Sequence, residues 1–241
     1  MAKIALVTGA NKGIGLETAR QLAKGGIHVI LAARDGAKGA AAAQKLKSED
    51  LDVEALTLDV SDSASIAAAV KAVGAKHGRL DILVNNAGIG VDSPAKKVSE
   101  QTLETWRKTF DTNFFGLLAV TQGFLPLLAK SEAGRIVNLT SILGSLTLHS
   151  DPKSPIYTYK VPAYNVSKTA VNAWTVQLAY ELRDTKIKVN AVHPGHVKTD
   201  MGGAAAPMEI VDGAKSGVAM ALIGPDGPNG TYTHLGRTLP W

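Results

Sequence analysis

Short runs of nearly continuous apolar residues recur along the chain, separated by longer segments with helical periodicity. Continuous apolar runs are typical of strands buried on both faces, as in a parallel sheet covered by helices. The predicted strands are Ile4–Thr8, His28–Ala33, Val53–Leu58, Asp81–Asn85, Arg135–Thr140, Lys188–Val192 and a weaker one at Tyr232–His234. The predicted helices between them are Gly13–Lys24, Gly36–Ser48, Ser61–His77, Ser99–Leu128 and Ala163–Arg183.

This alternation predicts the α/β class, with a doubly wound parallel sheet of about seven strands and helices on both faces. No repeat or low-complexity linker divides the chain, so one domain over residues 1–241 is expected. Two stretches interrupt the rhythm: Leu146–Pro162 contains three prolines, and Met201–Pro207 is rich in glycine and alanine. Both follow predicted strand ends, where open α/β sheets bind ligands.

Composition excludes several classes of site. The 241 residues include no cysteine, which rules out disulfides, thiolate metal sites and cysteine nucleophiles. No apolar run reaches the ~18–20 residues that span a bilayer, and the first residues do not resemble a signal peptide, so a cytoplasmic protein without membrane contact is expected. The net charge is +5, but Lys and Arg are scattered, which argues against nucleic acid as a partner.

The first predicted strand ends in a glycine-rich turn, Thr8-Gly9-Ala10-Asn11-Lys12-Gly13-Ile14-Gly15, and a helix begins at once. Glycines there let the backbone approach a pyrophosphate at the helix N-terminus, although the turn alone could be a plain βα connection. The spacing Gly-x3-Gly-x-Gly resembles that of the short-chain dehydrogenase/reductase family. This resemblance implies a Rossmann-like domain with a cofactor half at about residues 1–140 and a catalytic and substrate half at about 141–241.

Three further segments resemble the family at successive strand ends. They are Asp59-Val60, Asn85-Asn86-Ala87-Gly88 and His193-Pro194-Gly195-His196-Val197-Lys198-Thr199. The resemblance implies that the first holds the adenine ring, that Asn86, Ala87 and Gly88 line the cofactor, and that Pro194, Gly195, Val197 and Thr199 hold the nicotinamide carboxamide. Asp59 could instead cap the next helix, but Ser61 would serve that purpose equally well.

The end of the second strand bears on the choice between NAD(H) and NADP(H). The sequence there is Ala32-Ala33-Arg34-Asp35, and the acidic position of NAD-dependent members falls on Ala33. Arg34 could grip a 2′-phosphate bidentately, with Lys12 as a second cation. We therefore expect NADP(H), with NAD(H) as the less favoured alternative because Asp35 could take the ribose role.

Tyr164 and Lys168 stand four positions apart, on one face of a predicted helix. A tyrosine is a weak acid at neutral pH, and a nearby ammonium is expected to lower its pKa. Carbonyl reduction needs such a phenol to deliver a proton as hydride reaches carbon. Tyr-x3-Lys is common by chance, but none of Tyr157, Tyr159 and Tyr180 has a lysine at this spacing.

The resemblance supplies two partners for this pair. Asn138-Leu139-Thr140-Ser141 resembles the family's Asn-x-Ser-Ser pattern, which implies that Ser141 holds the substrate oxygen. Asn113 matches the family's helix asparagine, which implies that it holds a water for proton relay. The four expected catalytic residues are therefore Asn113, Ser141, Tyr164 and Lys168.

The substrate side of the site is expected in loops, at Leu143, Tyr157, His196 and Met201. His193 is expected to be structural, and no metal site is expected, since His193 and His196 flank a Pro-Gly break without a carboxylate nearby. Ser141 and Tyr164 lie 23 positions apart (164 − 141), more than in most of the family, and the C-terminus lacks the Asp-Gly-Gly of tetrameric members. A monomer or dimer is therefore expected rather than a tetramer.

Together these features predict reversible NADPH-dependent reduction of a ketone or aldehyde to an alcohol. One alternative is a dedicated metabolic reductase of an acyl-carrier ketoester, a sugar or a steroid. A second, from another class, is a binding protein that senses NADP(H). Such sensors tend to lose the tyrosine or the lysine, and this chain keeps both.

Overall fold

Within residues 2–93 and 95–241, which the computed structural model describes, eight strands form one sheet in the order β3-β2-β1-β4-β5-β6-β7-β8. Neighbours pair in parallel except β7 and β8, which are antiparallel. The strands are β1 (Ile4–Thr8), β2 (His28–Ala33), β3 (Val53–Thr57), β4 (Ile82–Asn85), β5 (Arg135–Leu139), β6 (Lys188–Val192), β7 (Tyr232–His234) and β8 (Arg237–Thr238). The order reverses between β1 and β4, the position at which doubly wound sheets bind dinucleotides. The predicted fold class is confirmed.

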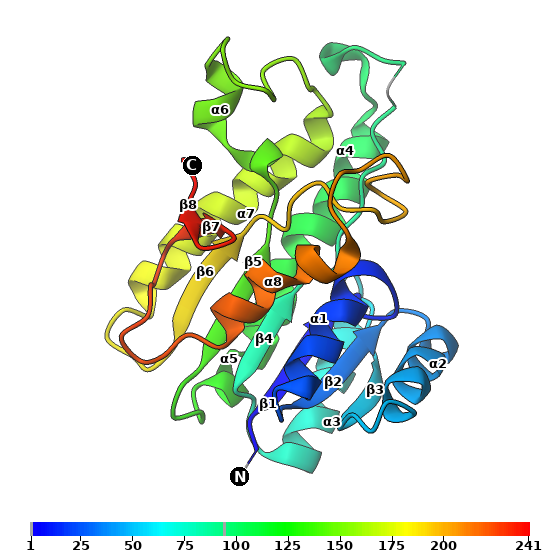
Figure 1. The fold of residues 1–241 in the computed structure, drawn as a ribbon, viewed down its shortest axis with the longest axis vertical. Helices are drawn as coiled ribbons and strands as arrows, with labels where there is room; N and C mark the ends of the chain where they lie inside the picture. Colours follow the sequence, from blue (N-terminus) through cyan, green and yellow to red (C-terminus); the bar gives the residue numbers. More distant parts are fainter. Residues whose placement is uncertain (1, 94) are drawn as a thin grey trace.

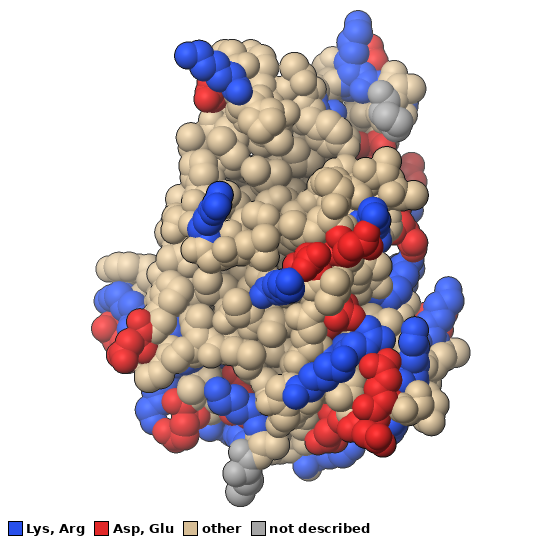
Figure 2. All heavy atoms as spheres, viewed as in Figure 1, with Lys and Arg blue, Asp and Glu red and all other residues tan. Residues whose placement is uncertain are grey.

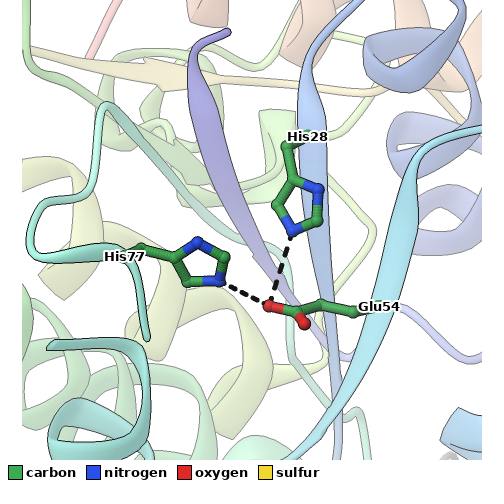
Figure 3. A group of neighbouring side chains, drawn as sticks. All are labelled: His28, Glu54 and His77. Carbon is green, nitrogen blue, oxygen red and sulfur yellow. Dashed lines mark hydrogen bonds and ion pairs between the residues drawn. The ribbon is translucent and has the colours of Figure 1, made fainter. Parts of the chain in front are cut away.

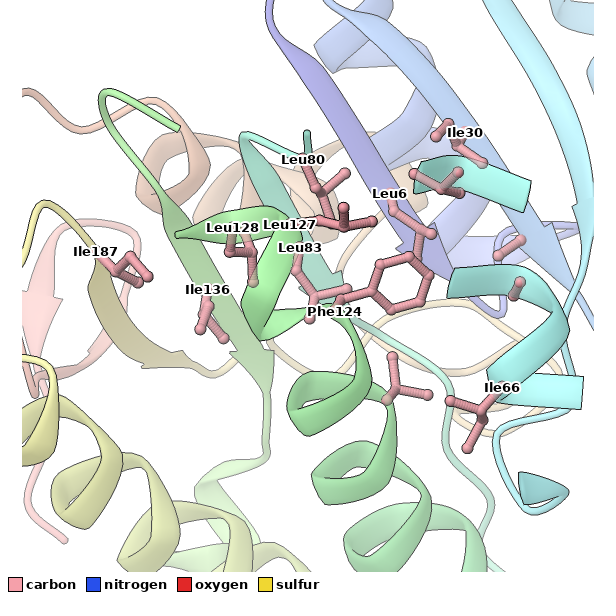
Figure 4. Packing of buried hydrophobic residues seen from close by; sticks show 14 of the residues in the cluster. Leu6, Ile30, Ile66, Leu80, Leu83, Phe124, Leu127, Leu128, Ile136 and Ile187 are labelled. Carbon is pink, nitrogen blue, oxygen red and sulfur yellow. The ribbon is translucent and has the colours of Figure 1, made fainter. Parts of the chain in front are cut away.

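Helices cover both faces of the sheet (Figure 1). One face carries α1 (Gly13–Lys24), α2 (Gly36–Lys47) and α8 (Ile210–Ala221), and the other carries α3 (Ser63–His77), α5 (Leu117–Leu128) and α7 (Pro162–Glu181). Each face has its own hydrophobic cluster. In the cluster on the face covered by α3, α5 and α7, Phe124 of α5 is fully buried and projects towards Leu6 and Leu83 of the sheet (Figure 4). The sheet is therefore buried on both sides, as its apolar strands require.

The predicted helix Ser99–Leu128 is not one regular helix. A 3-10 turn occupies Val98–Glu100, and α4 (Leu103–Phe110) begins after Thr102, whose side chain accepts a hydrogen bond from Thr105 N at 3.2 Å. A π-helical turn, Asp111–Gly116, then joins α4 to α5. Such wide turns often occur at functional sites, and this one contains Asn113.

Two other predicted boundaries were wrong. Helix α3 begins at Ser63 and is capped by Asp62, whose carboxylate accepts from Ala64 N at 2.9 Å, so neither Asp59 nor Ser61 caps it. Within the predicted loop Leu146–Pro162, residues Leu146–Ser150 form the short helix α6, whose first turn is capped by Ser145. In both cases a short polar side chain just ahead of the helix supplies the cap.

Helix α8 and strand β8 were not predicted. Gly213 and Gly217 lie inside α8 and weaken its helical signal. Both are buried, and the small residues on this face of α8 allow α1 and α8 to pack closely. Packing therefore decides the conformation where local propensity does not.

Charged side chains of both signs are interspersed over the lower part of the molecule in Figure 2, whereas the upper part, around α6 and α7, is largely uncharged in this view. Among the helices that the structure describes, none combines the length and apolar character that crossing a bilayer requires.

Candidate active site

Six segments of the predicted site follow the carboxyl ends of neighbouring strands. Gly9 follows β1, Arg34 follows β2, Asp59 comes shortly after β3, Asn86 follows β4, Ser141 follows β5 and Pro194 follows β6. Because parallel strands all end at one edge, the topology gathers these residues at that edge of the sheet.

The glycine-rich turn after β1 is shaped by close backbone contacts. Gly9 has φ +63°, and a Cβ at this position would lie 2.9 Å from Ala87 Cα, so a larger residue does not fit. Helix α1 begins at Gly13, and among the described residues no side chain caps its first turn. Its free N–H groups and helix dipole therefore favour an anion such as a phosphate.

Asn85 and Asn86 hold the strand ends together. The Asn86 amide donates to Thr8 O at 2.7 Å and to Gly9 O at 3.2 Å, which fastens the glycine turn to the end of β4. Asn85 is buried and donates to Thr121 Oγ1 and to Asn138 Oδ1, both at 2.9 Å. The adjacent asparagines thus have structural partners, and Ala87 and Gly88 continue from them along the site edge.

At the end of β2, Arg34 is exposed and Asp35 is occupied as the N-cap of α2. Asp35 Oδ1 accepts from Lys38 N at 3.0 Å, and its carboxylate pairs with the Lys38 ammonium at 3.6 Å. The pKa of Asp59 is lowered although partial burial acts against this, because Ser61 donates to its carboxylate and Arg34 lies nearby. The Asp35 carboxylate, which could have bound a ribose, is thus engaged as the cap of α2. Arg34 is exposed and lies near Asp59.

The segment after β6 lies against the glycine turn. A Cβ at Gly13 would lie 3.5 Å from Thr199 Cγ2, and Lys12 forms an ion pair with Asp200. The Thr199 hydroxyl accepts from Gly202 N at 3.1 Å and donates to Val197 O at 3.3 Å. The segment expected to hold the nicotinamide and the glycine turn expected to hold the pyrophosphate are therefore neighbours.

His193 is buried at the start of this segment. Burial lowers the pKa of His193 to about 3, with His234 and His196 acting in the same direction, so its imidazole is neutral. Its Nδ1 accepts from Gly195 N at 3.3 Å, and its carbonyl bonds to His234 Nδ1 at 2.8 Å. The expected structural role of His193 agrees with these contacts, which shape the Pro194-Gly195 turn.

Tyr164 lies in the first turn of α7, which begins at Pro162. The proline has no N–H to satisfy, and the next two N–H groups are capped by a carboxylate from a distant segment. Asp92 accepts from Ala163 N at 2.8 Å and from Tyr164 N at 3.0 Å. Sequence reasoning missed Asp92, since the contact joins positions 72 residues apart.

Lys168 is 4% exposed and lies one turn further along α7. Its ammonium donates to Leu139 O at 3.0 Å and lies 5.7 Å from the centroid of the Tyr164 ring. The Thr140 hydroxyl donates to Lys168 O at 3.2 Å. A Cβ at Gly144 would lie 2.8 Å from the Lys168 carbonyl carbon, so only glycine allows the Ser141 segment to approach α7 this closely.

Ser141 is held in this arrangement from two sides. Its hydroxyl accepts from Leu143 N at 3.2 Å, and its carbonyl accepts from the buried Tyr232 hydroxyl at 2.7 Å. Tyr232 stacks on Trp241, with ring centroids 5.3 Å apart, and Trp241 O in turn accepts from Thr147 N at 2.9 Å. Strand β7 and the C-terminal residues therefore support the Ser141 segment, and the sequence carried no signal for this contact.

Asn113 is fully buried, so it is not a solvent-facing helix residue. Its side chain accepts from Ile89 N and donates to Ile89 O, both at 2.8 Å, and it donates to Ser167 Oγ at 3.0 Å. Ser167 Oγ donates to Tyr164 O at 2.7 Å. The amide of Asn113 thus connects the segment after β4 to the turn of α7 that carries Tyr164.

The pKa of Tyr164 is raised rather than lowered, so the direction predicted from the sequence is wrong for this structure. Burial raises the pKa of Tyr164 to about 12, which outweighs a lowering contribution from the Ser141 side chain, and Tyr159 raises it further. Burial also lowers the pKa of Lys168 to about 8. The phenol therefore keeps its proton at neutral pH, beside the Ser141 hydroxyl and an ammonium that is still largely charged.

The four predicted substrate residues lie on two segments, one after β5 and one after β6. Leu143 is half-buried two positions after Ser141, Tyr157 contacts Lys160, His196 bonds to Gly202 O at 2.9 Å, and Met201 is 54% exposed. Tyr159, by contrast, lies close enough to affect the pKa of Tyr164. A surface hollow of about 320 Å³ lies at the end of the segment between β6 and α8. It is lined by Pro207, Met208, Asp212, Lys215 and Leu235.

Comparison with known proteins agrees with the fold and with the family that the sequence resembles. The family model for short chain dehydrogenase matches residues 3–210, and this chain belongs to that family. It is 34% identical to carbonyl reductase (NADPH) 1 of Mus musculus over an alignment of 280 positions, gaps included, which covers 99% of this chain and 98% of that protein. It is 32% identical over 299 residues to (+)-neomenthol dehydrogenase of Capsicum annuum, covering 95% of each. The NADPH-bound carbonyl reductase structure from chicken fatty liver matches with a TM-score of 0.87 and 30% identity, over 100% of this chain and 99% of that one.

Proposed function

We propose that this protein reduces a ketone or aldehyde to an alcohol with NADPH. In the reverse reaction it would oxidise the alcohol with NADP⁺. The observation that carries the proposal is the position of Tyr164: its protonated phenol lies beside the Ser141 hydroxyl, one helical turn from the buried Lys168. Similarity to carbonyl reductase (NADPH) 1 of Mus musculus supports the reaction class.

The residues at the strand ends fit NADP(H). The uncapped first turn of α1 suits the pyrophosphate, and the exposed Arg34 suits a 2′-phosphate. Lys12 of the glycine turn would be a second cation there if it left its ion pair with Asp200. Asp35 is engaged as the cap of α2, which removes the main candidate for binding a free 2′-hydroxyl. The cofactor would supply the hydride for the carbonyl carbon.

Tyr164 would donate its proton to the substrate oxygen, and its raised pKa keeps that proton in place until the oxygen becomes basic. The Ser141 hydroxyl would orient the same oxygen and stabilise its developing charge. The Lys168 ammonium would stabilise the phenolate that remains after transfer. Asn113 would fix the segment after β4 against α7, and with it the approach to Lys168.

We infer a bulky, apolar carbonyl compound as substrate. The region around α6 and α7 carries few charges in Figure 2, and Tyr159 and Leu146 are exposed there. One relative is a (+)-neomenthol dehydrogenase, whose name denotes a cyclic terpenoid alcohol.

The direct test follows NADPH absorbance with a panel of cyclic apolar ketones, aromatic aldehydes, sugars and short linear ketones, repeated with NADH. We expect turnover with the cyclic and aromatic compounds and a preference for NADPH. Tight NADPH binding without turnover of any compound would instead indicate a sensing protein.

A further inference from the structure

Three side chains with metal-ligating atoms meet at the opposite end of the sheet from the candidate active site. His28 is the first residue of β2, Glu54 is the second of β3, and His77 is the last of α3. Figure 3 shows both imidazoles directed at the same carboxylate. The His77 Nε2 and Glu54 Oε1 atoms are 2.6 Å apart, and His28 Nε2 lies 3.4 Å from the same oxygen. One ligand atom from each residue lies within 4.8 Å of the others.

The second nitrogen of His28 is also bound. His28 Nδ1 is 2.8 Å from Asp52 Oδ1, a hydrogen bond that places the proton on Nδ1, since a carboxylate can only accept. His28 Nε2, on the other side of the ring, faces the Glu54 carboxylate and is a buried nitrogen without a hydrogen-bond partner in the described part of the chain. A cation between this nitrogen and the carboxylate oxygen, which are 3.4 Å apart, would give Nε2 a partner.

The carboxylate–imidazole–ligand arrangement is the one found around protein-bound metals. A metal-ligating histidine usually donates its other N–H to a carboxylate or carbonyl, which fixes its orientation. Asp52 supplies this contact to His28. The donors are two imidazole nitrogens and one carboxylate oxygen, a set typical of zinc and of other late first-row divalent ions.

Two of the three separations compare with those that a tetrahedral ion requires. With metal–ligand distances of about 2.0–2.2 Å, two ligands of one zinc ion lie about 3.3–3.6 Å apart. The His28–Glu54 separation of 3.4 Å meets this, and the His77–Glu54 hydrogen bond at 2.6 Å would have to open by about 0.7–1.0 Å. The ligand atoms of the third pair, His28 and His77, lie within 4.8 Å of each other. All three side chains are 12–19% exposed, so a small rotation is possible and water can reach the fourth position.

Lys76 also contacts this cluster. Its ammonium pairs with Glu54 Oε2, whereas both imidazoles face Oε1. One oxygen of the carboxylate thus faces the two imidazoles, while the other is paired with lysine.

We propose that His28, Glu54 and His77 bind one divalent zinc-like ion, with a water as fourth ligand and Asp52 as the residue that orients His28. The ion would join β2, β3 and α3, three elements of the half that we assign to the cofactor. This site is independent of the proposed reductase activity, because His28 and Glu54 stand at the amino ends of strands whose carboxyl ends carry the cofactor motifs, and His77 joins them from the end of α3.

The proposal is tested by stripping the purified 241-residue protein with a chelator and titrating it with Zn²⁺ by calorimetry. We expect one ion per chain and a melting temperature about 5 °C higher at a hundredfold excess of Zn²⁺ over the dissociation constant. Co²⁺ should give the visible absorption of a tetrahedral nitrogen and oxygen site. His77→Gln should weaken Zn²⁺ binding by about a hundredfold or more, and Asp52→Asn by about 10–100-fold.

His196→Gln is the matched control, because His196 is an exposed histidine at the other end of the sheet. The proposal predicts wild-type Zn²⁺ affinity for this variant. If His77→Gln fails to fold, Asp52→Asn leaves all three ligands in place and still decides the question. Wild-type binding no tighter than that of His77→Gln, or affinity lost in His196→Gln alone, would overturn the site.

Discussion

Tyr164 and Lys168 respond to the same burial in opposite directions. Burial disfavours the charged form of each, so the pKa of Tyr164 rises to about 12 and the pKa of Lys168 falls to about 8. The phenol is thereby kept as an acid, and the lysine titrates close to the physiological range. This combination suits proton donation to a carbonyl better than proton removal from an alcohol.

The pH dependence of the two directions should therefore differ. Lys168 carries its charge below pH about 8 and loses it above, while Tyr164 stays protonated up to about 12. We expect kcat/KM for ketone reduction to be level at neutral pH and to fall as pH rises through about 8. Alcohol oxidation, which needs the phenolate, should be slow at neutral pH. A reductive rate that rises steadily with pH would contradict this assignment.

At the scale of elements, α7 is positioned by contacts at its first turn. Asp92 caps the N–H groups of Ala163 and Tyr164, and Gly144 allows the segment after β5 to reach Lys168. Asn113 and Ser167 join the π-helical turn to the same part of α7. Three segments that are distant in sequence thus fix the orientation of one helical turn.

Replacing Asp92 tests whether this cap matters for function. Asp92→Ala should lower the free energy of unfolding by about 1 kcal/mol and also reduce kcat by tenfold or more, an order-of-magnitude expectation, because the turn that carries Tyr164 frays. Thermal melting and steady-state kinetics measure the two effects.

Asp62→Ala is the matched control, since the Asp62 carboxylate caps the first turn of α3, which follows the Asp59-Val60 segment and does not carry Tyr164. It should cost similar stability and leave kcat unchanged. Equal losses of kcat in both variants would show that Asp92 acts only through stability.

Tyr232→Phe tests the support of Ser141 by β7. The change removes one hydroxyl and leaves the buried Ser141 carbonyl without its 2.7 Å donor, which costs about 1–3 kcal/mol. We expect a reduced kcat for ketone reduction with an unchanged KM for NADPH, because the ring still packs on Trp241. Tyr180→Phe, at a tyrosine that is 66% exposed, should behave as wild type. An unaltered kcat in Tyr232→Phe would show that the hydrogen bond from Tyr232 does not support the catalytic role of Ser141.

For the molecule as a whole, the central strands were predictable because each is a short apolar run and parallel strands are buried on both faces, whereas the two-residue, exposed β8 was not. That the motifs at their carboxyl ends gather at one edge was predictable, because parallel strands all end at the same edge of a sheet. Asp92 and Tyr232 were not, since their contacts span 72 and 91 residues and depend on how loops pack. The sign of the Tyr164 pKa shift depended on burial, which spacing along a helix does not report.

We expect a monomer or a dimer in solution. The segment between Ser141 and Tyr164 includes α6 and lengthens the loop ahead of α7, while Val176 and Tyr180 remain exposed further along that helix. Light scattering coupled to size exclusion should give one or two times the chain mass of 25.1 kDa. A particle of four chains would show that the longer loop leaves a tetramer interface open.

The most direct measurement is the turnover of Tyr164→Phe with NADPH and the best ketone of the panel, alongside NADPH affinity by fluorescence titration. The variant keeps the ring and removes only the hydroxyl that would deliver the proton. The account predicts a loss of kcat by about a hundredfold or more with NADPH affinity near wild type. Turnover equal to that of the wild type would contradict the assignment of Tyr164 as the acid.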